Sequence, residues 1–121
     1  PVVDETVIAV AEDLEVACMP GCHTPTEMLR AHRAGAQLCK LFPAPAGGPA
    51  WVRSVLGPMP HLKIVPTNGV DEHNAGDWIA AGAFAVGFVA TLFEPTDLAA
   101  GRWSAIEARA RRCLAAARAA V

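Results

Sequence analysis

The sequence contains two lysines, Lys40 and Lys63, and both lie in apolar runs rather than on polar helix faces. Burial disfavours a charged ammonium group, and a neutral amine can attack a carbonyl carbon to form a Schiff base. Lys40 stands near the carboxyl end of the run 38–42, the end from which parallel α/β sheets present catalytic side chains. Lys40 is therefore the candidate nucleophile, the alternative being a lysine that extends along its strand to solvent. Lys63 begins the run 62–65, towards the opposite rim, where that alternative is favoured.

Two turns that each follow an apolar run could hold an anion. The first, Pro66–Val70, precedes a predicted helix, and its backbone N–H groups could bind a phosphate or a carboxylate. An Asn-Gly pair such as Asn68–Gly69 also occurs for backbone geometry alone, which is the favoured interpretation without other signals. The second turn, Gly87–Thr91, has less glycine and offers one hydroxyl, so alone it predicts no site.

Other common catalytic and metal-binding patterns are not found. Cys18, Cys22 and His23 fit no common zinc spacing, so we expect no metal site. The sequence has no G-x-S-x-G, P-loop or G-x-G-x-x-G motif, which excludes serine hydrolases, Walker-type nucleotide sites and dinucleotide-binding folds. The cysteines lack C-x-x-C spacing and are expected to be reduced core residues: Cys18, Cys22, Cys39 and Cys113.

The elements that must position these residues alternate between helix and strand. Apolar runs bounded by breaker residues predict four buried strands, at 16–19, 38–42, 62–65 and 84–88. N-cap residues and helical spacing of apolar residues predict helices before, between and after them: one capped by Asp4, one capped by Thr24 or Thr26, a short one at 51–56, one capped by Asp71, and a last one at 104–120.

Strands separated by single helices indicate an α/β fold with a parallel sheet covered by helices, because parallel strands need crossover connections. Four such strands could form a small open sheet or part of a closed barrel, and periodicity does not choose between the two. No linker or low-complexity tract divides the 121 residues, so residues 1–121 are expected to form a single domain.

Composition narrows the classes of partner. The chain is 53% hydrophobic, has a net charge of −2 and contains only ten Lys and Arg residues, so it lacks the cationic face that nucleic acids and anionic membranes require. No apolar run is long enough to span a bilayer, and the N-terminus lacks the parts of a signal peptide. We therefore expect a soluble, cytoplasmic protein with neither a nucleic-acid nor a membrane partner.

Three motifs, taken in order and spacing, resemble the 2-keto-3-deoxy-6-phosphogluconate (KDPG) aldolase family, which includes the 4-hydroxy-2-oxoglutarate (KHG) aldolases. They are Met19–Glu27 (MPGCHTPTE), Lys40–Ala44 (KLFPA) and Pro66–Val70 (PTNGV). The resemblance covers essentially the whole chain. Its most specific motif is Lys-x-Phe-Pro-Ala, in which the family's lysine forms the Schiff base with pyruvate.

The resemblance implies a class I aldolase on a parallel (β/α)8 TIM barrel, assembled as a homotrimer. Such an enzyme cleaves a 2-keto-4-hydroxy acid to pyruvate and an aldehyde without a metal or an organic cofactor. The same comparison implies a role for six residues. Lys40 is the nucleophile, Phe42 lines the pocket beside the imine and Thr67 approaches the pyruvyl group, while the phosphate-binding positions are Asn68, Gly69 and Ala90.

The sequence departs from the family pattern in both phosphate turns. The family's second turn carries Gly-Ser, where this chain has Val89–Ala90, and Asn68 replaces a glycine of the first turn. Loss of a small residue and of a hydroxyl favours an unphosphorylated or shorter substrate.

The family's general-base glutamate and carboxylate-binding arginine belong to early strand-helix units that have no counterpart in this sequence. Read literally, the chain is expected to supply about the C-terminal half of the barrel, four of its eight strands. The leading hypothesis is thus a class I aldolase with Lys40 as nucleophile. The alternatives are a non-catalytic half-barrel that binds or assembles with another chain, and a phosphate-binding barrel enzyme that does not use an imine.

Overall fold

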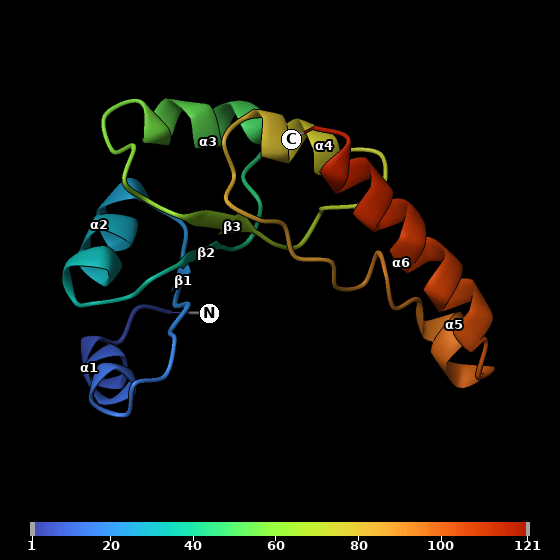
Figure 1. The fold of residues 1–121 in the computed structure, drawn as a ribbon, viewed down its shortest axis with the longest axis horizontal. Coiled ribbons are helices and arrows are strands. Elements are labelled where there is room, and N and C mark those ends of the chain that lie inside the picture. The colour runs from blue at the N-terminus through green and yellow to red at the C-terminus, as the bar shows by residue number, and fades with distance from the viewer. Residues whose placement is uncertain (1, 121) are drawn as a thin grey trace.

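A computed structural model of the protein describes residues 2–120 as a parallel three-stranded sheet, in the order β1-β2-β3, with helices before, between and after the strands (Figure 1). This confirms the predicted α/β class with a parallel sheet. None of the helices within residues 2–120 has the length and apolar character needed to cross a membrane. The elements are α1 (Glu5–Asp13), β1 (Gly21–Cys22), α2 (Pro25–Arg33), β2 (Cys39–Leu41), α3 (Pro49–Leu56), β3 (Ile64–Pro66), α4 (Ala75–Ala80), α5 (Pro95–Ala99) and α6 (Trp103–Arg118).

Side-chain caps begin the first two helices, as predicted. The Asp4 carboxylate accepts hydrogen bonds from the N–H groups of Thr6 and Val7, at 2.9 and 3.2 Å. Thr24 forms a capping box with Glu27, in which each side chain accepts from the other residue's backbone N–H. Because these bonds satisfy amides that have no partner inside the helix, they set where α1 and α2 start.

The core lies between the sheet and the helices that cover one of its faces. Leu41 of β2 and Ile64 of β3 are fully buried, together with Met28 of α2 and Val52 of α3. The parallel register aligns Lys40 with Val65 and so places Leu41 one residue later, beside Pro66. Burial of these branched and thioether side chains supplies most of the stabilisation of the sheet.

The strand predicted at 16–19 is wrong, because β1 lies two residues further on, at Gly21–Cys22. Its pairing with β2 begins at Pro20, whose carbonyl accepts from the Lys40 N–H at 3.0 Å. Proline lacks an N–H donor but keeps its carbonyl acceptor, so it can lead into a strand instead of breaking one. The Cys18 N–H bonds instead to the side chain of Gln37, at 2.8 Å, which leaves the apolar run outside the sheet.

The prediction of a fourth strand at 84–88 is also wrong. The sheet described for residues 2–120 has three strands, and a single parallel bridge joins Thr67 to Gly87. This segment does lie beside β3, since the Phe84 N–H donates to the Ile64 carbonyl and the Gly87 N–H to the Pro66 carbonyl, each at 2.9 Å. Two widely spaced bonds and one bridge align the segment without forming a ladder.

The helix predicted to be capped by Asp71 begins later, since α4 starts at Ala75. The Asp71 carboxylate accepts from the N–H groups of His73 and Asn74, at 2.8 and 3.0 Å, and so closes a turn that precedes the helix. Such local bonding by aspartate stabilises a turn in the same way as it stabilises a cap.

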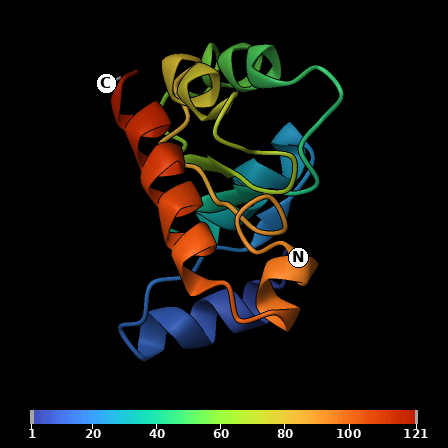
Figure 2. The ribbon, with the colours of Figure 1, turned by 90° about the vertical axis from the view of Figure 1, so that its right-hand side faces the viewer.

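A buried carboxylate joins the two C-terminal helices, which run along one side of the molecule (Figure 2). Asp97 of α5 accepts from Arg102 Nε and from a terminal nitrogen of Arg109, each at 2.7 Å. Arg109 also donates to the Leu92 carbonyl at 2.7 Å. The Arg109 and Arg102 guanidinium groups lower the pKa of the Asp97 carboxyl. This cluster sets the angle between α5, which no sequence pattern predicted, and α6.

Replacing Leu41 with alanine should lower the free energy of unfolding by about 2–5 kcal/mol, because the side chain is fully buried and a cavity would remain. Leu98→Ala is the matched control, since Leu98 is 45% exposed, and its effect should stay within about 1 kcal/mol. Urea unfolding monitored by circular dichroism measures both, and equal losses would contradict the assigned core.

Replacing Asp97 with asparagine should destabilise the protein at pH 7 and have progressively less effect in acid. The folded-state pKa of Asp97 lies below its ordinary value of 3.8, so the stabilisation is present above that value and is lost as the pH falls through the folded-state pKa. Unfolding free energies of both proteins at a series of pH values from 7 downward test this. Glu107→Gln, which removes an exposed pair with Arg111, should show little dependence on pH.

Candidate active site

Alternation along β2 places Lys40 on the opposite face of the sheet from the core. Its neighbours Cys39 and Leu41 are buried, and the Cys39 thiol contacts the Met28 carbonyl of α2 at 3.7 Å. Because successive strand side chains point to opposite faces, Lys40 lies on the face that the helices do not cover, where it is half-buried. In the adjacent strand, Val65 and Thr67 share this face.

The Lys40 amine lies over an aromatic ring. Its Nζ atom is 4.9 Å from the ring centroid of Phe42, the residue that directly follows β2. This is a cation–π distance, and the Phe42 side chain remains 37% exposed. The structure thus brings together the two residues of the Lys-x-Phe motif at the carboxyl end of β2.

Thr67 lies just beyond the end of β3 and is buried. Its N–H and its hydroxyl both donate to the Leu41 carbonyl, at 3.1 and 3.4 Å, so it is held against the end of the lysine strand. On its other side is Gly87: a Cβ atom there would lie only 2.7 Å from Thr67 Cγ2. The close approach of the two segments therefore requires glycine at 87.

The turn after β3 has the left-handed backbone that an anion-binding loop often uses. Asn68 and Gly69 have φ values of 62° and 86°, and asparagine is the non-glycine residue that best tolerates this region. Asn74 stabilises the turn by donating to the Gly69 carbonyl at 2.8 Å. Both turn residues are exposed, next to the end of β3.

The second turn is joined to the first by one hydrogen bond. The Thr91 hydroxyl, one residue after Ala90, donates to the Val70 carbonyl at 2.5 Å. That bond also uses the only hydroxyl of this turn, and Val89 is 55% exposed. This bond links the end of the second turn to the end of the first, and the second turn presents an aliphatic surface.

His23 contributes to the same edge of the sheet, a role that sequence reasoning missed because it weighed this residue only as a metal ligand. Its ring Nδ1 is 3.1 Å from the Pro43 carbonyl, in the loop that follows Phe42. A carbonyl oxygen only accepts hydrogen bonds, so Nδ1 is the donor in this contact. The sequence signal that could have identified this role is the position of His23 directly after the strand β1, at the edge of the sheet where the other candidate residues lie. Among residues 2–120, no group of three or more potential ligands could hold a metal.

The Glu27 carboxylate, four residues from His23, is committed to the start of α2. It accepts from the backbone N–H groups of His23 and Thr24, at 2.8 and 2.7 Å, and from the Thr24 hydroxyl at 2.9 Å. These donors lower the pKa of Glu27, the His23 amide having the largest effect. Glu27 is thus a structural carboxylate that positions the loop after β1.

The second lysine lies at the other end of the strands. Lys63 precedes β3, its side chain is exposed, and its Nζ is 5.1 Å from the ring centroid of Phe84. This agrees with the interpretation favoured for it from the sequence. The structure therefore separates the two lysines between opposite rims of the sheet, with Lys40 alone near the turns.

The sequence of this chain matches a known protein family and several of its members. Residues 1–109 match the KDPG and KHG aldolase family. A probable 2-dehydro-3-deoxy-6-phosphogalactonate aldolase of Rhizobium meliloti is 38% identical over 96 residues, covering 78% of this chain and 45% of the relative. A 2-dehydro-3-deoxy-phosphogluconate aldolase of Pseudomonas aeruginosa is 34% identical over 113 residues, covering 91% of this chain and 50% of the relative.

Solved structures agree with the sequence matches. A native KDPGal structure superposes with a TM-score of 0.85 at 28% identity, covering 99% of this chain and 57% of that one. A 4-hydroxy-2-oxoglutarate/2-deydro-3-deoxyphosphogluconate aldolase from TTHB1 gives 0.81 at 32% identity, covering 97% and 56%. The chain spans about half the length of the curated relatives it matches. On these matches and this site, the chain belongs to the KDPG and KHG aldolase family.

Proposed function

We propose that this chain carries the Schiff-base site of a class I aldolase, which cleaves a 2-keto-4-hydroxy acid to pyruvate and an aldehyde. The observation that carries the proposal is the position of the Lys40 amine, on the uncovered face of the sheet, 4.9 Å from the Phe42 ring and one strand from Thr67. Family membership supports it, since the relatives of this chain are named as aldolases. We further propose that additional strand-helix units complete a (β/α)8 barrel around this face.

The chemistry assigned to Lys40 follows from its amine. Nζ attacks the C2 carbonyl of the keto acid, and loss of water gives a protonated imine. When the 4-hydroxyl loses its proton, the C3–C4 bond breaks, the aldehyde leaves and the bonding electrons are held as an enamine. Protonation at C3 and addition of water then release pyruvate and restore the amine. The protonated imine accepts the bonding electrons of the C3–C4 bond, the task that a metal ion or an organic cofactor would otherwise perform, so the proposal includes neither.

The neighbouring residues have binding roles in this proposal. Phe42 offers its partly exposed side chain to the pyruvyl group, and Thr67 borders the same space from β3. The Asn68–Gly69 turn and Ala90 receive the far end of the substrate. The resemblance gives proton transfer to a glutamate in units that this sequence does not contain, so we assign that role to no residue of this chain.

The aldehyde product is proposed to be unphosphorylated or short. A phosphate needs several donors, and the hydroxyl of the second turn is already bonded to the Val70 carbonyl. Val89 and Ala90 add aliphatic surface where the family has Gly-Ser. The turn Asn68–Gly69 is exposed and offers its backbone N–H groups and the Asn68 side-chain amide, neutral donors that suit a hydroxyl or an aldehyde as well as a phosphate.

A non-catalytic assembly module is the second candidate. The observation that favours it is the pair of sheet edges that have no partner strand within residues 2–120, at β1 and at the bridged segment beside β3. Aldol cleavage measured with this chain would dismiss the second candidate, whereas a folded protein with no turnover would favour it.

In the protein with its barrel completed by the additional strand-helix units, incubation with pyruvate and sodium borohydride should attach one reduced pyruvyl group to Lys40, because borohydride reduces an imine to a stable secondary amine. Peptide mass spectrometry locates the adduct. Lys40→Met should abolish the labelling, and the matched variant Lys63→Met should leave it unchanged. Labelling that persists in Lys40→Met, or none in the unmodified protein, would reject the proposed nucleophile, and the second result would favour an enzyme that does not use an imine.

Cleavage of an unphosphorylated 2-keto-4-hydroxy acid should be at least as efficient as cleavage of its 6-phosphorylated analogue, when kcat/KM values are compared by coupled detection of pyruvate. Replacing Val89–Ala90 with Gly-Ser should shift the ratio towards the phosphorylated compound by about tenfold, the effect of one added charge-assisted hydrogen bond. A preference of the unmodified protein for the phosphorylated substrate by orders of magnitude would contradict the interpretation of these turns.

A further inference from the structure

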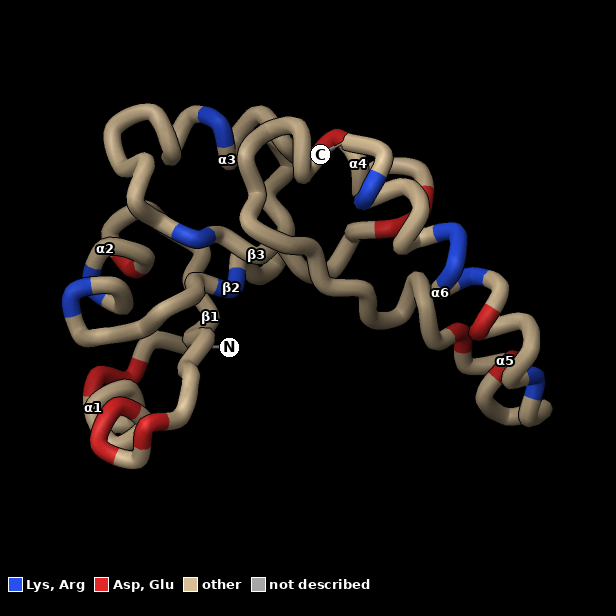
Figure 3. The backbone as a smooth tube through the Cα atoms, in the orientation of Figure 1, with Lys and Arg blue, Asp and Glu red and all other residues tan. Residues whose placement is uncertain are grey.

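Lys40 is the one charged residue on the three strands of the sheet described for residues 2–120 (Figure 3). Its Nζ atom contacts the Phe42 ring, 4.9 Å from the ring centroid. Because none of these strands supplies a carboxylate, the position of that ring determines the immediate surroundings of the amine. Whatever holds Phe42 therefore also affects how Lys40 meets a keto acid.

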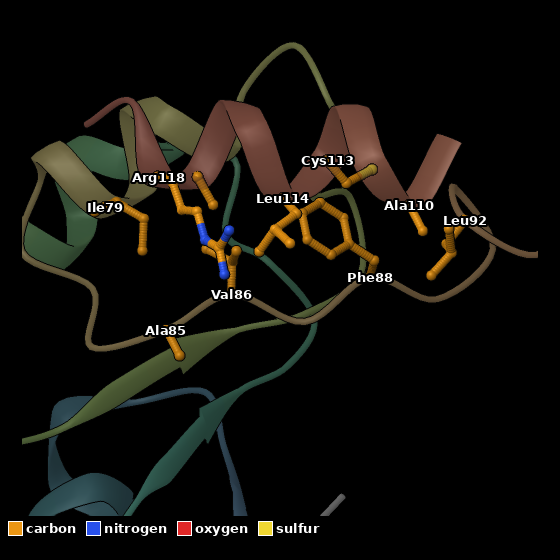
Figure 4. A pocket seen from close by; sticks show the side chains of 10 residues that line it. Ile79, Ala85, Val86, Phe88, Leu92, Ala110, Cys113, Leu114 and Arg118 are labelled. Carbon is orange, nitrogen blue, oxygen red and sulfur yellow. The ribbon is translucent and has the colours of Figure 1, made fainter. Parts of the chain in front are cut away.

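An apolar groove of about 410 Å³ between α6 and the segment 85–92 does not compete with this site (Figure 4). Figure 4 shows Val86 and Phe88 of that segment facing Leu114 of α6. The nucleophile that lines the groove is the Cys113 thiol, and burial raises the pKa of that thiol. The groove therefore offers a carbonyl compound neither an amine nor a thiolate at neutral pH, which leaves the carbonyl chemistry at the edge of the sheet.

Two hydrogen bonds from the end of β1 hold the backbone around Phe42. The Phe42 N–H donates to the Cys22 carbonyl at 3.0 Å, and the Pro43 carbonyl accepts from His23 Nδ1 at 3.1 Å. Cys22 pairs with Leu41, so the next step of the register sets His23 beside Phe42. Because Cys22 is buried in the core, alternation directs His23 to the uncovered face of the sheet.

The His23 ring replaces a backbone bond that the sheet lacks at this point. In a regular parallel ladder the Thr24 N–H would donate to the Phe42 carbonyl, but it donates instead to the Glu27 carboxylate at 2.7 Å. The His23 N–H donates to the same carboxylate at 2.8 Å. His23 is thus fixed at its backbone by Glu27, and its ring continues the connection between the two segments.

The loop that His23 holds also borders the turn assigned to the far end of the substrate. A Cβ atom at position 69, where the chain has Gly69, would lie 3.8 Å from Ala44 Cβ, which is ordinary van der Waals contact. A shift of the Pro43 carbonyl would therefore move both the Phe42 ring and the surface that packs on this turn.

We propose that His23 is a positioning residue of the Schiff-base site, an inference that rests on the proposed function. By donating from Nδ1 to the Pro43 carbonyl, it keeps the Phe42 ring beside the Lys40 amine, so that the amine meets the keto acid in one orientation. This role requires a hydrogen-bond donor at the position of Nδ1 and makes no use of proton transfer by the ring.

In the protein with its barrel completed by the additional strand-helix units, His23→Ala should lower kcat/KM for aldol cleavage by about threefold to tenfold, the effect of one neutral hydrogen bond. His23→Asn should restore most of this loss, because its side-chain nitrogen occupies the position of Nδ1. His23→Gln should not, because its amide nitrogen lies one bond further from the backbone. His61→Ala is the matched control and should leave kcat/KM unchanged, since His61 lies before β3, towards the opposite rim, with its ring centroid 4.7 Å from that of His32.

A double-mutant cycle tests the route through Phe42. In a Phe42→Ala background, His23→Ala should change kcat/KM by less than about twofold, because the ring that His23 positions is already absent. Losses that multiply, or equal losses in the Ala, Asn and Gln variants, would overturn the inference. Urea unfolding shows whether each variant is folded, and if His23→Ala is not, the comparison of His23→Asn with His23→Gln decides.

Two further measurements separate this inference from the proposed function. Long-range proton–nitrogen NMR correlations should show His23 Nδ1 protonated in the neutral ring, and a proton on Nε2 alone would overturn the inference whatever the activity. Borohydride labelling of Lys40 in the unmodified protein tests the proposed function, and its absence would reject both. Normal labelling together with full activity of His23→Ala would reject the positioning role alone.

Discussion

The alternation of side chains along the central strand is the constraint on which the rest of the structure depends. Cys39 and Leu41 must both point into the helix-covered core, so the residue between them can only point to the other face. A lysine at that position is anchored on both sides by buried neighbours. The backbone of β2, paired on both edges, therefore holds Lys40 in place, and within residues 2–120 the contact recorded for its amine is the Phe42 ring.

The starts of α1 and α2 were predictable because local side chains cap them, whereas α4 begins after the turn that Asp71 closes and α5 has no side-chain cap. Asp4 and Thr24 cap α1 and α2 through hydrogen bonds to residues two or three positions away. Strands depend instead on partners distant in sequence. The apolar run 16–19 failed to pair because β2 aligns with Pro20 and Cys22, and the run 84–88 makes only scattered bonds to β3. Hydrophobicity does not set the register of such segments, and here it did not predict their burial either, since Val16 and Phe84 are 57% and 56% exposed.

In the candidate site too, sequence patterns predicted the contacts within a strand and missed the contacts between loops. The face shared by Lys40 and Phe42 follows from their spacing of two in a strand, so a sequence motif was enough to place them together. The bond from the Thr91 hydroxyl to the Val70 carbonyl and the contact of His23 with Pro43 join loops that are about twenty residues apart. Loop conformation sets these contacts, and no periodic pattern encodes it.

The close approach of Gly87 to Thr67 restricts how this protein can vary. Since even a methyl group at 87 would meet Thr67 Cγ2 at 2.7 Å, no substitution there is accommodated unless the threonine side chain moves. Any change at 67 that relieved the crowding would also alter the group that borders the proposed substrate space. A larger residue at 87 therefore needs either a movement of the Thr67 side chain or a smaller residue at 67, twenty positions earlier in the chain.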